Sequence, residues 1–210
     1  MSSRNSRIIY LTILGTLLAW EQYKSSEGGS VFEGIIILII GLVGLLFLIW
    51  TIIKDYKEYV LTKKRTSYLP TFIGLAFITL ILSIDFYQDR KMNAKSLLTG
   101  YYDGGFNGFS IDLKENGTYI MSNGSGLGES YFYGTYTIKD SIITIDKSSI
   151  DNVITSDRLV VRNSQYYLPL DTLNKVDTTK ANYFTQIDKQ GKEINSELRF
   201  RVTSDNRTKK

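Results

Sequence analysis

The sequence predicts a membrane protein in two parts: three helices in the N-terminal half, then an all-β C-terminal domain, an antiparallel up-and-down meander that forms a barrel or half-barrel. Apolar segments alternate with short charged stretches as far as about residue 90. The remaining residues are polar and rich in glycine and tyrosine, and they alternate with the period of antiparallel strands. The mean hydropathy of −0.09 averages these two opposite halves.

The first apolar segment, residues 8–20, is short for a membrane span, because about 20 residues are needed to cross the hydrocarbon core. Three interpretations remain open: a short span, a signal peptide that is cleaved or retained, and a helix lying in the membrane interface. Arg4 and Arg7 resemble the basic start of a signal peptide, but no cleavage site of small residues follows Ala19. A short span is therefore the preferred interpretation.

The second and third apolar segments have the length and composition of complete spans. Residues 34–53 are twenty residues without a charge, which at about 1.5 Å rise per residue matches the hydrocarbon thickness of a bilayer. Residues 69–87 carry one charge, Asp85, and Pro70 lies in the first turn, where a helix tolerates proline. Aromatic residues flank both segments, as is typical of membrane interfaces.

The charges of the connecting segments predict the orientation. Segment 54–68 carries five basic residues, whereas segment 21–30 carries only Lys24. Basic connections stay in the cytoplasm, so we expect the N-terminus inside and everything after Tyr87 outside. The expected location is the cytoplasmic membrane of a bacterium, crossed more than once, with the C-terminal domain extracytoplasmic.

Composition argues against several classes of function. Residues 96–210 hold 14 basic and 14 acidic residues, so the net charge of +4 belongs to the membrane half and we expect no nucleic-acid partner. The sequence has no His and no Cys, which excludes imidazole catalysis, thiol nucleophiles and metals held by these residues. The glycine-rich segment 123–129 lacks the Lys and Ser/Thr of a phosphate-binding loop and is expected to be a mobile hairpin loop. We therefore expect no catalytic residues, no cofactor and no metal, and predict that the protein is not an enzyme.

The domain boundaries follow from the change in pattern. Residues 88–96 are a polar connector that can continue the last helix, residues 97–203 are the β domain, and residues 204–210 are a tail expected to be disordered. The first strand is expected at 97–102 and further strands at 183–187 and 198–202.

Two hairpins have a register that keeps one face apolar. In the first, a three-residue turn at 115–117 has a left-handed Gly117. It places Leu113 opposite Tyr119 and Ile111 opposite Met121.

In the second hairpin, the two-residue turn at Asp140 and Ser141 places Ile138 opposite Ile143 and Tyr136 opposite Ile145. A third hairpin is expected to turn at Asn163 and Ser164. It places Val161 opposite Tyr166 and Leu159 opposite Leu168, and Pro169 stops the strand or marks a sheet edge.

Three segments of the predicted β domain resemble a known family. Gly100-Tyr-Tyr, residues 111–119 and residues 134–145 resemble the opening strands of bacterial lipocalin-like domains, which are calycin-type barrels on envelope proteins. The resemblance covers about fifty residues, 97–146, and implies a barrel that holds a small apolar ligand. The chain departs from the family in its first strand, where Tyr101 or Tyr102 replaces the expected Trp.

Tyrosines are the candidate binding residues of the β domain. Tyr119, Tyr136 and Tyr166 fall on the predicted inner faces, where they line a pocket for an apolar or carbohydrate-like ligand or pack a small core. The sequence thus predicts a membrane protein that presents its β domain for partner recognition, in sensing, envelope interaction or toxin immunity. Its expected partners are the lipid bilayer and an envelope protein. The alternative is a lipocalin-like carrier of a small apolar ligand.

Overall fold

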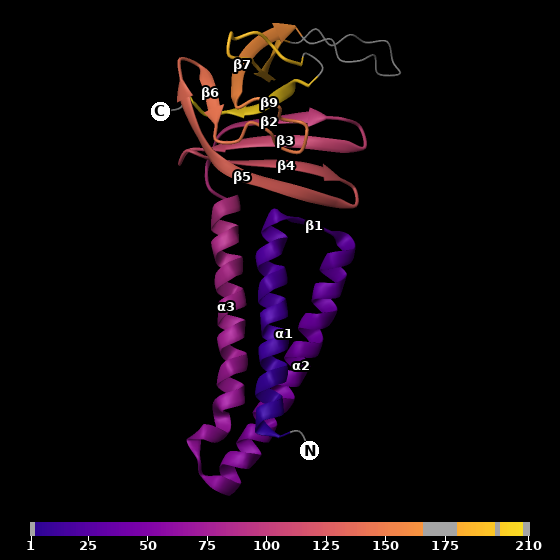
Figure 1. Ribbon diagram of the computed structural model, residues 1–210, viewed down its shortest axis with the longest axis vertical. Helices are drawn as coiled ribbons and strands as arrows, with labels where there is room; N and C mark the ends of the chain where they lie inside the picture. The colour runs from indigo at the N-terminus through magenta and orange to yellow at the C-terminus, as the bar shows by residue number, and fades with distance from the viewer. Residues whose placement is uncertain (1–2, 166–179, 196–197, 208–210) are drawn as a thin grey trace. The chain divides into compact units, whose positions relative to one another are not determined.

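The computed structural model describes residues 3–165, 180–195 and 198–207 (Figure 1). The chain divides into two compact units, residues 1–93 and residues 94–210. The first unit is helical and the second is all β, which confirms the fold class predicted from the sequence.

The helical unit contains three helices joined by short connections. The helices are α1 (Arg4–Lys24), α2 (Val31–Thr62) and α3 (Leu69–Met92), and the connections contain η1 (Ser25–Glu27), β1 (Gly28–Ser30) and η2 (Arg65–Tyr68). Two segments, 31–62 and 65–92, are long and apolar enough to cross a membrane. Their length and composition indicate membrane association.

The helices extend beyond the predicted spans. α2 continues to Thr62 and ends at Lys63, which has a left-handed φ of 57°. Most of segment 54–68, predicted to be a connection, is therefore helical. Charged residues end the apolar run without ending the helix, because Lys, Glu and Asp are compatible with helical backbone. α3 continues to Met92, as expected for the connector.

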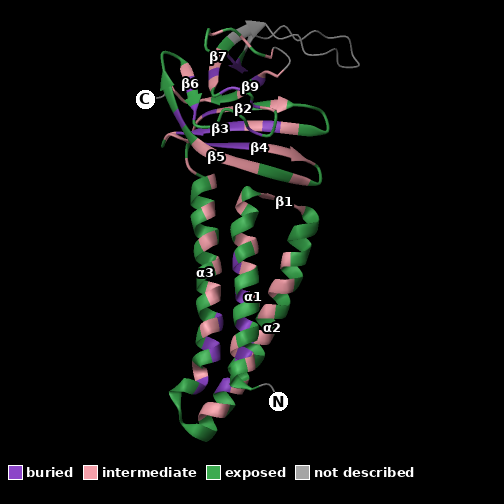
Figure 2. Ribbon diagram, viewed as in Figure 1, coloured by how far each residue is buried: buried purple, intermediate pink, exposed green. Residues whose placement is uncertain are grey.

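Glycines allow the helices to pack closely. A Cβ atom at Gly15 of α1 would lie 2.2 Å from the Phe77 ring, and one at Gly74 of α3 would lie 2.4 Å from Leu48. The buried residues of the helices gather toward the end of this unit that holds the N-terminus (Figure 2). The rest of the helical surface is mainly apolar and exposed, as is typical of helices that face lipid.

Eight strands form a closed antiparallel barrel in the second unit. They are β2 (Ser96–Asp103), β3 (Asn107–Lys114), β4 (Thr118–Ser125), β5 (Gly128–Lys139), β6 (Ile142–Ile145), β7 (Arg158–Gln165), β8 (Lys180–Gln186) and β9 (Phe200–Asp205). Each strand pairs with the next, and β9 pairs with β2. The predicted meander is thus a complete barrel, and closure removes the exposed edges of a half-barrel.

The first predicted hairpin is confirmed. Leu113 pairs with Tyr119 and Ile111 with Met121, and Gly117 has a φ of 82°. Only a residue without a Cβ adopts this conformation readily.

The second predicted hairpin is confirmed as well. Tyr136 pairs with Ile145 and Ile138 with Ile143. Both turn residues, Asp140 and Ser141, have positive φ angles of 51° and 68°. A two-residue turn of this kind matches the right-handed twist of the strands that it joins.

The turn predicted at Asn163 and Ser164 is wrong. Both residues lie inside β7, where Val161 pairs with Phe184 and Leu159 pairs with Gln186. Asn and Ser favour turns but also tolerate extended backbone, and pairing with the distant strand β8 prevails over the local preference. The residues proposed to pair across that turn, Tyr166 and Leu168, lie outside the described residues, as does Pro169.

The last strand also differs from its expected bounds of 198–202. β9 begins at Phe200 and ends at Asp205, inside the segment for which disorder was expected. The backbone N–H of Asn206 then donates to the carbonyl of Leu97 at 2.8 Å. Pairing with β2 therefore fixes the backbone as far as Asn206.

The barrel core is built from the inward faces of these strands and from one connection. Each of the eight strands contributes at least one buried apolar residue to a single cluster. The strand residues of this cluster are Leu98, Phe109, Ile111, Leu113, Tyr119, Met121, Tyr136, Ile143, Ile145, Leu159, Phe184 and Phe200. The connection between β6 and β7 adds Ile150 and Ile154, which are 2% and 0% exposed. In the described part of the barrel, the inward side chains therefore pack against one another.

Candidate functional site

A buried polar cluster joins the three helices at the end of the helical unit that holds the N-terminus. Arg7 lies in the first turns of α1, and its Nη2 atom is 2.7 Å from Oδ1 of Asp55 and 2.9 Å from Oε2 of Glu58, both on α2. The side chains of Arg7 and Asp55 are 6% and 0% exposed, whereas that of Glu58 is 34% exposed. One guanidinium is thus held between a fully buried and a partly exposed carboxylate.

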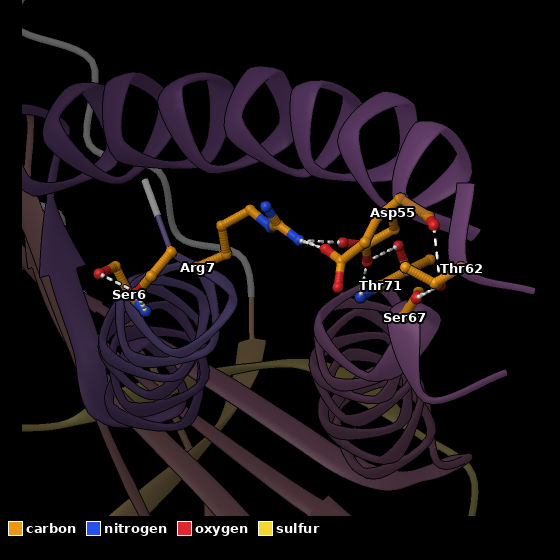
Figure 3. Close-up of polar contacts among 8 residues, drawn as sticks. Ser6, Arg7, Asp55, Thr62, Ser67 and Thr71 are labelled. Atoms are coloured by element: carbon orange, nitrogen blue, oxygen red, sulfur yellow. Dashed lines mark hydrogen bonds and ion pairs between the residues drawn. The ribbon is translucent and has the colours of Figure 1, made fainter. Parts of the chain in front are cut away.

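Asp55 also caps α3. The residue before that helix, Tyr68, makes no side-chain cap, but Oδ2 of Asp55 accepts from the backbone N–H of Thr71 at 3.0 Å and from its hydroxyl at 2.7 Å. Figure 3 shows Arg7 of α1 and Thr71 of α3 converging on Asp55. A carboxylate is favourable at a helix N-terminus because free N–H groups and the helix dipole meet there.

Helical spacing explains why these groups meet. Leu48, Thr51, Asp55 and Glu58 recur at intervals of three and four residues, which places them on one face of α2. Leu48, Thr51 and Asp55 are buried, and Thr51 is 0% exposed. The spacing itself is visible in the sequence and carries the inward face of the span into its charged extension. The prediction that the helix ends at residue 53 and that segment 54–68 is a connection leaves this face out.

Tyr119, a predicted binding residue, lies fully buried in the barrel core. Its hydroxyl donates to Oδ1 of Asp146 at 2.9 Å. Burial, together with this bond and the carboxylate charge, raises the pKa of Tyr119 well above its usual value. A Cβ at Gly134 would lie 2.4 Å from the Tyr119 hydroxyl and 2.2 Å from Asp146, so this bond needs glycine at that position.

Tyr136, the second predicted residue, is 8% exposed and also belongs to the core. Its hydroxyl donates to the carbonyl of Lys114 at 2.7 Å, and burial raises its pKa. Tyr119 and Tyr136 lie on the neighbouring strands β4 and β5, whereas Tyr166 is outside the described residues. Both described tyrosines contribute to packing, and their role in ligand binding stays a prediction.

A groove of about 380 Å³ crosses the outer face of strands β2 to β5. Its floor consists of small residues in register: Gly108 pairs with Gly124, and Ser110 pairs with Ser122. The two serine hydroxyls are 2.7 Å apart. Two glycines without side chains and two small serines at adjacent positions create the depression.

Larger side chains from the flanking strands form the walls of this groove. A Cβ at Gly108 would lie 2.0 Å from the Tyr101 hydroxyl, and one at Gly124 would lie 3.1 Å from Cγ of Glu129. Tyr101 and Glu129 therefore lie across the two floor glycines. Phe106, 76% exposed, stands at one hairpin tip.

Glu129 is oriented by a neighbouring tyrosine. The Tyr131 hydroxyl donates to Oε2 of Glu129 at 2.7 Å. This hydrogen bond, with burial and the carboxylate charge, raises the pKa of Tyr131 to about 12. Among the described residues that line the groove, none is Lys or Arg. The groove thus offers hydroxyls, aromatic faces and a carboxylate, which suit a neutral or basic partner.

Sequence reasoning missed the groove as a site, although it recognised both hairpins that bound it. Segment 123–129, expected to be a mobile loop, forms the ends of β4 and β5, joined at Gly126 and Leu127. The described residues contain no group of three or more His, Cys, Asp or Glu that could hold a metal ion.

Comparison with known proteins found no matching family model, no similar curated protein and no similar solved structure. The closed eight-stranded barrel is consistent with a lipocalin-like barrel, in which sequential strands close in the same way. The arrangement of the described residues therefore carries the argument about function.

Proposed function

We propose that the protein is a non-enzymatic membrane protein whose helices anchor a barrel, and that the barrel recognises an envelope protein through its outer groove. The supporting observation is the contrast between the two sides of the barrel wall. The described inner side is filled by its own side chains, whereas the outer side carries an open groove with an exposed aromatic residue at its rim. Exposed aromatic residues beside polar groups are typical of interaction surfaces.

The chemistry of the groove suggests the kind of partner segment. Glycines bring the backbone of β3 and β4 to the surface of the floor, so an extended segment can approach closely. Glu129 favours a basic or hydrogen-bond-donating group, and Tyr101 and Phe106 provide apolar contacts. The proposed partner presents an extended segment with a basic residue next to an apolar one.

The membrane anchor includes α1 in this proposal. Cleavage after α1 would remove Arg7, whose ion pair with Asp55 is buried in the intact chain. It would also remove the helix that packs against α2 and α3, including the contact of Gly15 with Phe77. At about 1.5 Å per residue the 21 residues of α1 extend about 31 Å, and its apolar run, residues 8–20, covers about 20 Å of that length, so the charged ends of α1 lie at the two membrane interfaces. We therefore propose that α1 is a retained span, with residues 63–68 cytoplasmic and the barrel extracytoplasmic.

Site-specific photocrosslinking tests recognition by the groove. A benzophenone amino acid replaces Phe106 at the groove rim or, as the matched control, the exposed Thr144 on β6. In the full-length protein in its native membrane, position 106 should give a discrete crosslinked species that Glu129→Lys removes. Equal crosslinking from both positions, or none from position 106, would count against the proposal.

A carrier is the second candidate, favoured by the closed eight-stranded topology. Native mass spectrometry of the purified full-length protein tests it, because a carrier retains a small apolar molecule in its barrel. Retention of such a molecule that survives Glu129→Lys would favour the carrier over surface recognition.

A further inference from the structure

The helical unit contains a cleft that its own side chains do not fill. The cleft has a volume of about 280 Å³ and is lined by residues of all three helices, among them Leu11, Leu18, Gly41, Leu48 and Phe77. A Cβ at Gly41 would meet nothing within 4 Å, in contrast to Gly15 and Gly74, which are covered by side chains. Protein interiors are close-packed, so an apolar gap of this size calls for an occupant.

The dimensions of the cleft match one leaflet of a bilayer. Along α1 it runs from Leu11 to Gln22, which is about 16 Å at about 1.5 Å per residue. Half of a hydrocarbon core about 30 Å thick is about 15 Å. A single acyl chain therefore has the length to lie along the cleft.

A polar pocket adjoins one end of this cleft. The two share Ile37, and the pocket is lined by Glu21, Lys24, Glu33 and the glycine-serine connection before α2. Lys24 Nζ lies 3.9 Å from Oε1 of Glu33, and these side chains are 53% and 49% exposed. The pocket therefore presents both signs of charge directly next to an apolar cleft.

We propose that this combined site binds a zwitterionic phospholipid with an amine head group. One acyl chain lies in the cleft, the phosphate lies beside Lys24, and the ammonium group lies beside Glu21. A purely anionic head group would meet two carboxylates for one ammonium, which disfavours it. The inference rests on the proposed membrane anchoring of the helices but not on recognition by the groove.

Gly41→Leu tests the site, because Gly41 lines the cleft and a Cβ there would meet nothing within 4 Å, so the added side chain occupies space proposed for the acyl chain. Leu42→Phe is the matched control, since Leu42 is 55% exposed and does not line the cleft. The full-length protein in detergent is titrated with dioleoyl phosphatidylethanolamine or dioleoyl phosphatidylglycerol, and bound lipid is counted by native mass spectrometry. The original protein should retain one phosphatidylethanolamine and prefer it by about tenfold.

Gly41→Leu should weaken that binding at least about tenfold, and Leu42→Phe should leave it unchanged. Glu21→Gln removes the carboxylate proposed to hold the ammonium group. It should reduce the preference for phosphatidylethanolamine without touching the cleft, which keeps the test decisive if Gly41→Leu fails to fold. Unaltered binding in Gly41→Leu, or an equal or greater affinity for phosphatidylglycerol, would overturn the proposal. Failure of membrane anchoring is recognised separately, because the protein would then stay in solution without detergent.

Discussion

Arg7→Met removes the cation of the buried cluster while keeping a long apolar side chain in its place. Asp55 is then left fully buried with its negative charge, and only the two hydrogen bonds from Thr71 remain. Breaking a buried ion pair by removing one partner costs about 3–5 kcal/mol. Because Thr71 still donates two hydrogen bonds to the carboxylate, we expect the free energy of unfolding to fall by about 3 kcal/mol, near the lower end of this range.

Two further variants separate the pair from ordinary packing. Glu58→Gln should cost about 0–1 kcal/mol, because its ion pair is partly exposed. The double variant Arg7→Met/Asp55→Asn removes both charges and keeps an oxygen that accepts from Thr71. It should therefore be more stable than Arg7→Met alone.

Tryptophan fluorescence provides the assay. Both tryptophans of the chain, Trp20 and Trp50, lie in the helical unit, so their emission follows the helices without a contribution from the barrel. The free energy of unfolding is measured by titration of the detergent-solubilised full chain with sodium dodecyl sulfate. A double variant less stable than Arg7→Met would refute the reasoning, as would equal losses for Arg7→Met and Glu58→Gln.

Three predictions concern the barrel. Gly134→Ala should destabilise the barrel by about 1–3 kcal/mol in urea unfolding, because the added methyl group collides with the hydrogen-bonded Tyr119 and Asp146 side chains. Gly126→Ala is the control: its methyl group meets nothing within 4 Å, so its effect should be close to neutral. The hydrogen bond to Glu129 raises the pKa of Tyr131 from 10.0 to about 12 in the folded state, so the stability that neutral Tyr131 contributes is complete below pH 10 and is lost as the pH rises toward 12. In Tyr131→Phe the free energy of unfolding should therefore fall less steeply between pH 10 and 12. An unchanged alkaline profile would contradict this prediction. Burial opposes ionisation of Asp146, but hydrogen bonds from Thr135 and Tyr119 lower its pKa below 3.8. The stability that ionised Asp146 contributes is therefore present above pH 3.8 and is lost below it. In acid unfolding, the stability of Asp146→Asn should depend less on pH than that of the original protein.

The parts of the fold that depend on neighbours in sequence could be predicted. The hairpins around Gly117 and Asp140-Ser141 combine a turn signal with an apolar face that allows one register. The turn at Asn163-Ser164 could not be excluded in the same way, because the partner of β7 is β8, whose residues come after the undescribed segment 166–179. Closure of the barrel likewise depends on β2 pairing with β9, the most distant strand along the chain.

The candidate sites were harder to predict than the fold. The apolar run of α2 ends at residue 53, and nothing local indicates that Asp55 faces Arg7 and Thr71 from two other helices. The groove depends on three strand registers at once. Two glycines and two serines must align across β3 and β4, and Tyr101 of β2 and Glu129 of β5 must lie beside them. Tyr119 and Tyr136 were correctly placed on the inner face, but inward position alone does not distinguish a packed core from a ligand pocket.

Cysteine accessibility tests the central claim most directly, that the helices anchor a barrel outside the cytoplasmic membrane. The chain contains no Cys, so single substitutions give unambiguous signals. Lys64→Cys lies between α2 and α3, and Thr144→Cys lies on the exposed face of β6. In spheroplasts treated with a membrane-impermeant maleimide, position 144 should be labelled at once and position 64 only after permeabilisation. Labelling of position 64 in intact spheroplasts, with position 144 protected, would contradict the account.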